Sequence, residues 1–244
     1  MLDLSRFSLL SFDCYGTMID WEAGIFSALR PLLAAHNKRV NDVTLLKMYS
    51  ELELEAEQKA YIRYREVLKS VVRGFGERLG FGPSEAEVSS LPESLASWQA
   101  FPDTVAALRE LKTRYQLAVI SNIDDDLFAC TAPQLGVKFD HVITAQQALC
   151  YKPCKRIFQI ARGRFGVAPE KWLHVGQSIY HDVIPAQAMG IAAVWVNRPS
   201  PREGAGATKA VAGKPDLEVA SLKELVELVS SSAGSRTETD PFQV

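Results

Sequence analysis

The sequence predicts an α/β fold, in which a doubly wound parallel sheet carries an inserted α-helical cap. Two observations predict it. Short apolar runs alternate with helical patterns over most of the chain, which is typical of βαβ units and a parallel sheet. A long helix-rich stretch without a clear strand follows the first apolar run, and an all-helical segment inserted at that point is expected to form a cap.

Four apolar runs are predicted to be buried strands. Residues 7–12 (FSLLSF) are too few for a helix and lead into a turn at 15–17. The other runs are 117–120, 172–175 and 192–196, with a weaker segment at 142–149. Helical patterns at 102–114, 125–135, 154–165 and 181–189 separate them. The sequence therefore alternates strands and helices as a doubly wound sheet requires.

The predicted domains are a core of residues 1–19 and 99–229 and a cap of residues 20–98. Residues 43–73 of the cap are dense in Leu, Glu, Ala, Lys and Arg, which favour helix. Residues 199–214 are rich in Gly, Ala and Pro and are predicted to be a loop. Residues 230–244 are polar without apolar periodicity, so a disordered tail is expected.

Four glutamates alternate along the predicted cap helix, at Glu51, Glu53, Glu55 and Glu57. Alternate residues of a helix do not share one face. We therefore expect a solvated helix surface here rather than a metal cluster.

Composition excludes several classes of partner. The chain has 244 residues, 23% of them charged, and a formal net charge of −2, whereas nucleic acids and anionic membranes require a basic surface. No apolar run reaches the roughly 18–20 residues of a membrane-spanning helix, and the first residues lack a signal-peptide pattern. We expect a soluble, cytoplasmic protein that binds neither nucleic acid nor membrane.

The four cysteines, Cys14, Cys130, Cys150 and Cys154, are expected to be reduced thiols, since intracellular cysteines rarely pair. Cys150 and Cys154 have no second Cys or His pair nearby to complete a zinc site.

A first chemical motif, Asp13-Cys14-Tyr15-Gly16-Thr17, directly follows the first predicted strand. Ligands of open parallel sheets bind beyond the carboxyl ends of the strands, so the Asp13 carboxylate would point into that crevice. Thr17 could donate a hydrogen bond to it. The alternative is that Asp13 caps the next helix.

Polar side chains follow three other predicted strands. Ser121 and Asn122 come after 117–120, where they would bind an anionic group or form an ordinary turn. Lys152 precedes a helix and would hold an anion or keep Asp13 ionised, although most lysines are simply solvated. Asp182 ends the motif Gly176–Asp182 and would pair with Lys152, position a water, bind a metal or cap a helix.

The order of these motifs at successive strand ends resembles the haloacid dehalogenase superfamily, whose four motifs stand here as DCYGT, SN, YKP and GQSIYHD. The resemblance covers residues 7–228 and includes the cap after the first motif. It implies a Rossmann-like core and a hydrolase with a nucleophilic aspartate.

Tyr15 points to one branch of that superfamily. Phosphatases of the superfamily have a second Asp at this position as general acid, and a phenol with a pKa of about 10 replaces it poorly. The pattern resembles the (S)-2-haloacid dehalogenases, in which Asp displaces halide from the α-carbon and water hydrolyses the resulting ester. Halide is a weak base and needs no proton, so the resemblance implies an enzyme without metal or other cofactor.

The resemblance implies roles for individual residues. Asp13 would be the nucleophile, Thr17 its positioning donor and Lys152 its ion-pair partner. Ser178 and Asp182 would orient the hydrolytic water. The substrate would be a small anionic molecule, with Ser121 and Asn122 binding its carboxylate and the leaving halide. Tyr15 would pack beside the reacting carbon, and a homodimer is suggested by the resemblance alone.

The sequence departs from the dehalogenase pattern at several positions. An approximate alignment places Tyr49 where the dehalogenases have a halide-binding Arg in the cap, with Lys47, Arg63 and Arg65 as stand-ins. A Tyr of the pattern is here Phe158, and the fourth motif has Gln177 and Ser178 in a spacing that resembles the phosphatase form. The alternatives are therefore a Mg-dependent phosphatase for a small phosphorylated metabolite, whose magnesium site the change to Gln177 would weaken, and a specialised or inactive scaffold that binds a small molecule.

Overall fold

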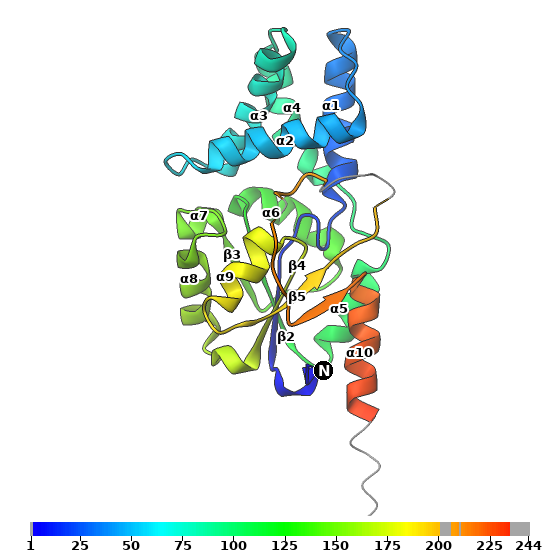
Figure 1. Ribbon diagram of the computed structural model, residues 1–244, viewed down its shortest axis with the longest axis vertical. Coiled ribbons are helices and arrows are strands. Elements are labelled where there is room, and N and C mark those ends of the chain that lie inside the picture. Colours follow the sequence, from blue (N-terminus) through cyan, green and yellow to red (C-terminus); the bar gives the residue numbers. More distant parts are fainter. Residues whose placement is uncertain (1, 201–205, 210, 235–244) are drawn as a thin grey trace, which may run out of the picture.

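The computed structural model describes residues 2–200, 206–209 and 211–234. A six-stranded sheet forms its centre, with the strand order β3-β2-β1-β4-β5-β6 and parallel pairing throughout (Figure 1). The strands are β1 (Leu9–Phe12), β2 (Gln116–Ser121), β3 (His141–Thr144), β4 (Trp172–Gly176), β5 (Ala192–Val196) and β6 (Leu217–Val219). Because the strands run parallel, the residues that follow β1, β2 and β4 meet at one edge of the sheet.

Helices cover both faces of the sheet, which gives the predicted doubly wound α/β fold. On one face, α5 (Thr104–Lys112), α6 (Asp125–Thr131) and α10 (Leu222–Gly234) pack with Leu10 and Phe12 in one apolar cluster. On the other face, α8 (Lys155–Phe165) and α9 (Ile184–Gln187) pack with Leu9 in a second cluster. Alternate residues of β1 therefore point into different layers, as the pleat of a strand requires.

Ser11 is the polar exception in the apolar central strand. It is fully buried, and its Oγ accepts a 2.6 Å hydrogen bond from Trp172 Nε1 and lies 2.7 Å from His174 Nδ1. These contacts satisfy a hydroxyl that would otherwise be costly to bury. They also fix the orientation of His174 on the neighbouring strand.

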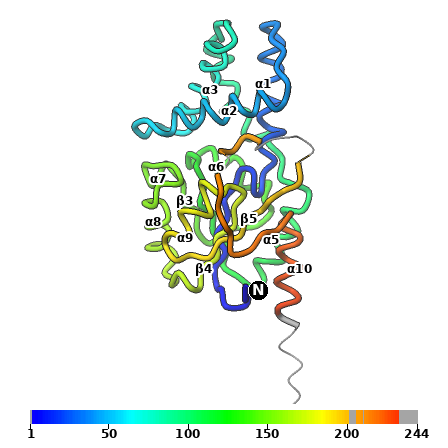
Figure 2. The backbone as a smooth tube through the Cα atoms, viewed as in Figure 1, coloured from blue at the N-terminus to red at the C-terminus, as the bar shows by residue number. Residues whose placement is uncertain are grey.

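Four helices lie together above the carboxyl edge of the sheet (Figures 1 and 2). They are α1 (Trp21–Ala35), α2 (Asp42–Glu57), α3 (Tyr64–Leu79) and α4 (Glu85–Ser94). The amphipathic pattern of these helices buries their apolar residues in the cluster that also contains Phe12 and Leu10. The predicted cap boundaries at residues 20 and 98 stay a prediction.

A side chain of the core domain caps the N-terminus of one cap helix. Arg63, the residue before α3, provides no side-chain hydrogen bond to the first turn of the helix. Instead, the two carboxylate oxygens of Asp124 each accept a 3.0 Å hydrogen bond, from the backbone N–H groups of Tyr64 and Arg65. Asp124 is fully buried, so a core residue satisfies the first turn of a cap helix.

Several predicted elements need correction. The weaker segment at 142–149 is split between β3 and the short helix α7 (Ala145–Ala148), and β6 was not predicted. The helical stretch 43–73 is interrupted between α2 and α3. Residues 230–234 belong to α10 rather than to a disordered tail, and the remainder of that tail, like part of the predicted loop 199–214, lies outside the described residues.

Among the described residues, no helix is both long and apolar enough to cross a membrane. All four cysteines have free thiols in the structure, as expected.

Candidate active site

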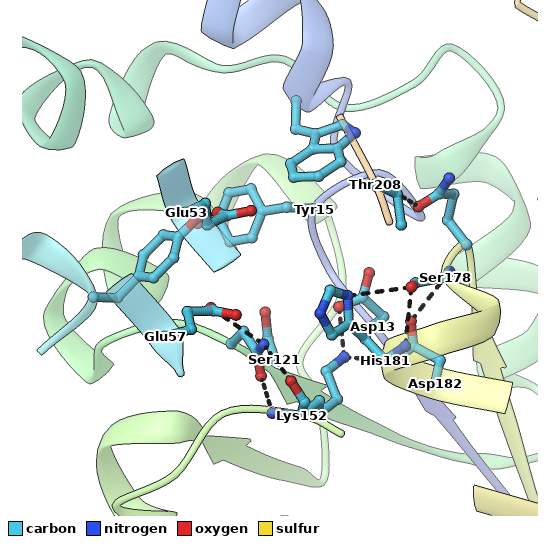
Figure 3. A pocket seen from close by; sticks show the side chains of 14 residues that line it. Asp13, Tyr15, Glu53, Glu57, Ser121, Lys152, Ser178, His181, Asp182 and Thr208 are labelled. Carbon is cyan, nitrogen blue, oxygen red and sulfur yellow. Dashed lines mark hydrogen bonds and ion pairs between the residues drawn. The ribbon is translucent and has the colours of Figure 1, made fainter. Parts of the chain in front are cut away.

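A pocket lies where β1, β2 and β4 end, between the sheet and the cap helices (Figure 3). Its floor holds side chains from each of the four sequence motifs, namely Asp13, Ser121, Asn122, Lys152, Ser178 and Asp182. Its roof comes from the cap, with Trp21, Glu53, Glu57 and Tyr64. The topology thus gathers residues that lie far apart in the sequence.

Asp13 follows β1 and is held at three atoms. Its backbone N–H donates to the Val175 carbonyl, and Thr17 Oγ1 donates a 2.9 Å hydrogen bond to its Oδ2. Lys152 Nζ lies 2.8 Å from its Oδ1. The tight turn after Asp13 depends on Gly16, whose φ of +91° is strained for a side chain-bearing residue. The structure contradicts the alternative prediction that Asp13 merely caps a helix, because the partners of its carboxylate are the side chains of Thr17 and Lys152.

Lys152 is the central cation of the pocket. Its ammonium group donates to Asp13, to Asp182 Oδ1 at 2.6 Å and to the Ile120 carbonyl at 2.9 Å. Burial opposes the charge of Lys152, but the two carboxylates raise its pKa above the ordinary value. An ammonium group has three donors, and here all three are used within the protein.

Asp182 is ionised more firmly than Asp13. Burial alone would raise the pKa of Asp182, but Lys152 and His174, whose Nε2 lies 3.1 Å from Oδ1, lower it below its usual range. Burial raises the pKa of Asp13, against the opposing effects of Lys152 and Thr17. Asp13 is therefore the carboxylate whose charge the protein stabilises less, which suits a nucleophile.

Gly176 allows Asp182 to approach the end of β4. A Cβ atom at Gly176 would lie 2.5 Å from Asp182 Cγ, a distance that the packed carboxylate excludes.

Ser121 and Asn122 end β2 beside Lys152. Asn122 Oδ1 accepts a 2.7 Å hydrogen bond from the Lys152 backbone N–H, and its Nδ2 donates to the Lys152 carbonyl at 3.3 Å. These bonds tie the second motif to the third. Ser121 is 1% exposed and lines the pocket.

The fourth motif wraps the remaining side of the pocket. The Gln177 N–H donates to Thr17 Oγ1 at 2.9 Å, and Gln177 Oε1 accepts from Thr208 Oγ1. Ser178 Oγ lies 3.2 Å from His181 Nδ1, while His181 Nε2 is buried without a hydrogen-bond partner in the described residues. Burial lowers the pKa of His181 to about 4, so its imidazole is neutral at pH 7.

The aromatic residues predicted to bind substrate differ in position. Tyr15 lines the pocket, and its hydroxyl lies 2.7 Å from Thr131 Oγ1. Tyr49 is fully buried behind the pocket lining, where its hydroxyl donates to Glu53 Oε1 at 3.0 Å. Trp21, which the sequence analysis did not assign, lines the pocket and packs edge-on against Tyr49.

The expectation of a solvated glutamate surface is wrong for two of the four residues. Glu53 is 8% exposed, and both Glu53 and Glu57 line the pocket. Residues two apart on a helix point to different faces, but residues four apart share a face. The four glutamates therefore form two pairs, and Glu53 and Glu57 are the pair that faces the pocket. Glu51 and Glu55 lie on the other face, where both form ion pairs with Arg78.

None of the proposed stand-ins for a cap cation lines the pocket. Lys47 and Arg63 are exposed, and Arg65 forms an ion pair with Asp126 at 2.7 Å. Phe158 is buried against the edge of His174 rather than in the pocket lining.

His174 is a site residue that the sequence analysis missed. It lies within an apolar strand and contacts both Ser11 and Asp182. The sequence did contain a signal for it, because a histidine within the otherwise apolar predicted strand 172–175 needs a polar partner once it is buried.

Within the ranges that the structure describes, no group of three or more His, Cys, Asp or Glu side chains is arranged to hold a metal ion. The chemistry that the floor supports is nucleophilic attack by the Asp13 carboxylate, which Thr17 and Lys152 orient from two sides.

Comparisons with known proteins agree with this arrangement. The chain is 26% identical over 231 residues to an (S)-2-haloacid dehalogenase of Pseudomonas sp. (strain YL), covering 92% of this chain and 95% of that protein. It is 32% identical over 146 residues to a glyceraldehyde 3-phosphate phosphatase of Methanothermobacter thermautotrophicus, but only 56% of this chain is covered.

The fold recurs in the L-2-haloacid dehalogenase from Xanthobacter autotrophicus. That structure has a TM-score of 0.77 at 21% identity and covers 92% of this chain and 98% of its own. A family of haloacid dehalogenase-like hydrolases matches residues 7–190, which include all four motifs. The chain belongs to the haloacid dehalogenase-like hydrolase family.

Proposed function

We propose that the protein hydrolyses the carbon–halogen bond of small 2-haloalkanoic acids through an ester on Asp13. An Asp13 oxygen attacks the α-carbon, and the C–X bond breaks with its electron pair leaving on halide. Water then attacks the carboxyl carbon of the ester, which returns Asp13 and releases the 2-hydroxy acid and a proton. No leaving group needs protonation in the first step.

One observation carries this proposal. Asp13 is fixed by Thr17 on one oxygen and by Lys152 on the other, while Tyr15 stands where a phosphatase would need a general acid. The Tyr15 hydroxyl lies beside Thr131, and burial raises its pKa well above the usual value. Such a group is poorly suited to donate a proton to a leaving alkoxide.

The second step needs a group that takes a proton from water. Ser178 and Asp182 would orient that water, and the neutral imidazole of His181, which lines the same pocket, would accept its proton. Ser121 and Asn122 would bind the carboxylate of the substrate. Tyr15 would pack beside the reacting carbon, and Tyr49 would act from behind the lining by holding Glu53.

A single-turnover reaction in ¹⁸O-water tests the nucleophile. With enzyme in excess over (S)-2-chloropropionate, the first product should carry unlabelled oxygen from Asp13, and the label should appear in Asp13. Label that enters the product directly in the first turnover would exclude the ester.

A parallel assay separates dehalogenation from phosphate-ester hydrolysis. Halide release that persists in EDTA and disappears in Asp13→Asn supports the proposal. EDTA-sensitive phosphate release from an aryl phosphate would instead support the magnesium-dependent phosphatase. Failure of a correctly folded protein to turn over either substrate would favour a binding scaffold.

We further propose that the enzyme works in the cytoplasm, without a cofactor and as a homodimer. These three proposals rest on the relationship to the dehalogenases and on the composition of the chain. Light scattering coupled to size-exclusion chromatography tests the dimer, and a single-chain mass would exclude it.

A further inference from the structure

The roof of the pocket is acidic, although the substrate class proposed above is anionic. Glu53 and Glu57 are four residues apart on α2 and both line the pocket. Neither has an ion-pair partner among the residues that the structure describes, whereas Arg78 neutralises Glu51 and Glu55 on the opposite face. The outer pair of glutamates on α2 thus has a cationic partner, whereas the inner pair has no ion-pair partner among the described residues.

The inner pair also has unused acceptor atoms. Glu53 Oε1 accepts hydrogen bonds from Tyr64 at 2.5 Å and Tyr49 at 3.0 Å. Glu53 Oε2 has no hydrogen-bond partner in the described part of the chain, although the residue is only 8% exposed. Among the described residues, Glu57 accepts one hydrogen bond, at 3.4 Å from Asn122 Nδ2. Both glutamates line the pocket, so their free oxygens can accept hydrogen bonds from a bound ligand.

Within the described part of the chain, no Lys or Arg forms an ion pair with these oxygens, and Lys152 acts on Glu57 only through its charge, which opposes the rise of the Glu57 pKa. Lys152 is the one Lys or Arg among the residues lining this pocket, and all three of its donors are used on the floor. The other roof residues, Trp21 and Tyr64, are aromatic, and the Tyr64 hydroxyl donates to Glu53. Tyr15 from the core also lines the pocket (Figure 3). Aromatic faces attract cations as carboxylates do.

The energetics of the roof favour a bound cation over an apolar group. Burial raises the pKa of Glu53 to about 7 and raises the pKa of Glu57 well above its usual value, with Glu53 adding to the shift of Glu57. A cation between them would remove that penalty. The raised pKa values keep the two carboxyl groups partly protonated at neutral pH, and a cation would favour their ionised form, whereas an apolar group would leave the oxygens unpaired.

We infer that the pocket takes a substrate whose end remote from the reacting carbon carries an ammonium group, held by Glu53 and Glu57. The inference rests on the proposed dehalogenation, and it narrows the substrate to a 2-haloalkanoic acid with an amino group on its side chain. An ammonium group brings three donors, which match the unused oxygens of the two glutamates. The substrate carboxylate lies at the other end, near Ser121.

Matched substrates test the inference. (S)-ω-Amino-2-chloroalkanoates of four to six carbons are compared with (S)-2-chloroalkanoates in which a methyl group replaces the ammonium, by halide release. For at least one length, kcat/KM should favour the amino compound by roughly tenfold or more, the worth of a charge-assisted hydrogen bond. Equal or reversed preference at every length, with halide still released, would overturn the inference and leave the proposed function intact.

Variants locate the preference within the roof. Glu53→Gln and Glu57→Gln should each lower the ratio of the two kcat/KM values, which does not depend on the fraction of folded protein. Glu55→Gln, on the outer face of the same helix, should leave the ratio unchanged. A ratio that stays the same in both Glu53→Gln and Glu57→Gln would exclude these residues as the ammonium site.

If no chloroacid is turned over, the proposed function is refuted. A binding measurement then tests the ammonium site by itself. Calorimetry then compares n-butylammonium with n-butanol as probes for the wild-type protein. Binding of the ammonium ion alone, lost in Glu57→Gln and kept in Glu55→Gln, supports the roof as an ammonium site. Absence of binding, or equal binding of the alcohol, overturns it.

Discussion

At the residue scale, Lys152 sets the charge balance of the pocket floor. It lies between two carboxylates, with 1% of its side chain exposed, and both bonds are shorter than 3 Å. Removing one partner from a buried ion pair leaves the other charge without compensation, which costs more than the pair contributes. The two acids of the floor therefore depend on one amine.

Lys152→Met should lower the free energy of unfolding at pH 7 by about 3–5 kcal/mol and abolish turnover. The loss should shrink as the pH falls, because protonation of Asp13 and Asp182 removes the uncompensated charges. Urea denaturation at pH 7 and pH 4.5 measures the loss of stability and its dependence on pH, and halide release measures turnover. Lys69→Met, which breaks a surface pair with Glu66, is the control and should change stability by less than about 1 kcal/mol.

The pH dependence of turnover should report the raised pKa of Asp13. The nucleophile must be ionised, so kcat/KM should rise with pH through a midpoint above 3.8, the ordinary value for Asp. His181 titrates at about 4 and faces Asp182, Lys152 and Lys209. Because His181 is proposed to act only in hydrolysis of the ester, halide release in a single turnover of the His181→Asn variant serves as the control, and a limb that disappears there would belong to the imidazole instead.

At the element scale, the first turn of α3 depends on a residue outside the cap. Asp124 accepts hydrogen bonds from the N–H groups of Tyr64 and Arg65, and the adjacent ion pair of Arg65 with Asp126 lies at the surface. The hydrogen bonds are buried and the ion pair is not, so the capping contact should contribute more to cap–core attachment.

Asp124→Ala should cost about 1–2 kcal/mol of stability, the usual loss when a helix cap is removed. Amide hydrogen exchange should accelerate first at Tyr64 and Arg65, the donors that lose their acceptor. Asp124→Asn keeps one acceptor oxygen and should lose less. Equal exchange rates in wild type and Asp124→Ala would contradict the capping role.

At the scale of the whole molecule, burial of the roof carboxylates makes stability depend on pH. The pKa of Glu53 is raised from 4.5 to about 7 in the folded protein, so the unfolded chain releases this proton at lower pH than the folded one. The free energy of unfolding should therefore fall as the pH rises from 4.5 to 7. Glu57 acts in the same direction.

Glu53→Gln should remove part of this dependence and stabilise the protein at pH 8 by roughly 1–3 kcal/mol. The amide keeps an acceptor oxygen for Tyr49 and Tyr64, so the packing of the roof is retained. Thermal unfolding at pH 5 and pH 8 measures the change, with Glu55→Gln as control. A variant that is less stable than wild type at pH 8 would contradict the expected sign.

The floor of the site could be predicted from the sequence because its residues lie in short polar motifs that come after apolar runs. Parallel strands bring their carboxyl ends together, so Asp13, Ser121 and Asp182 converge once the strands are recognised. The roof could not be predicted in the same way. Which cap residues face the floor depends on how α2 and α3 pack, and sequence periodicity alone does not define that orientation.

Single residues illustrate the difference. Tyr49 was assigned to the roof by alignment but lies one layer behind it, while Glu53 in the next turn reaches the lining. The i, i+4 spacing of Glu53 and Glu57 was available in the sequence. Their burial was not, because a pair of glutamates at that spacing usually faces solvent.

The contact of Asp124 with α3 has a consequence for recombination among related enzymes. A chimera that grafts these cap helices onto another core would inherit Tyr64 and Arg65 without the acid that receives their N–H groups. The graft would lose its anchor unless the recipient core presents a carboxylate at the same place. Cap and core are therefore not interchangeable modules, and a change of substrate range by cap exchange must carry position 124 with it.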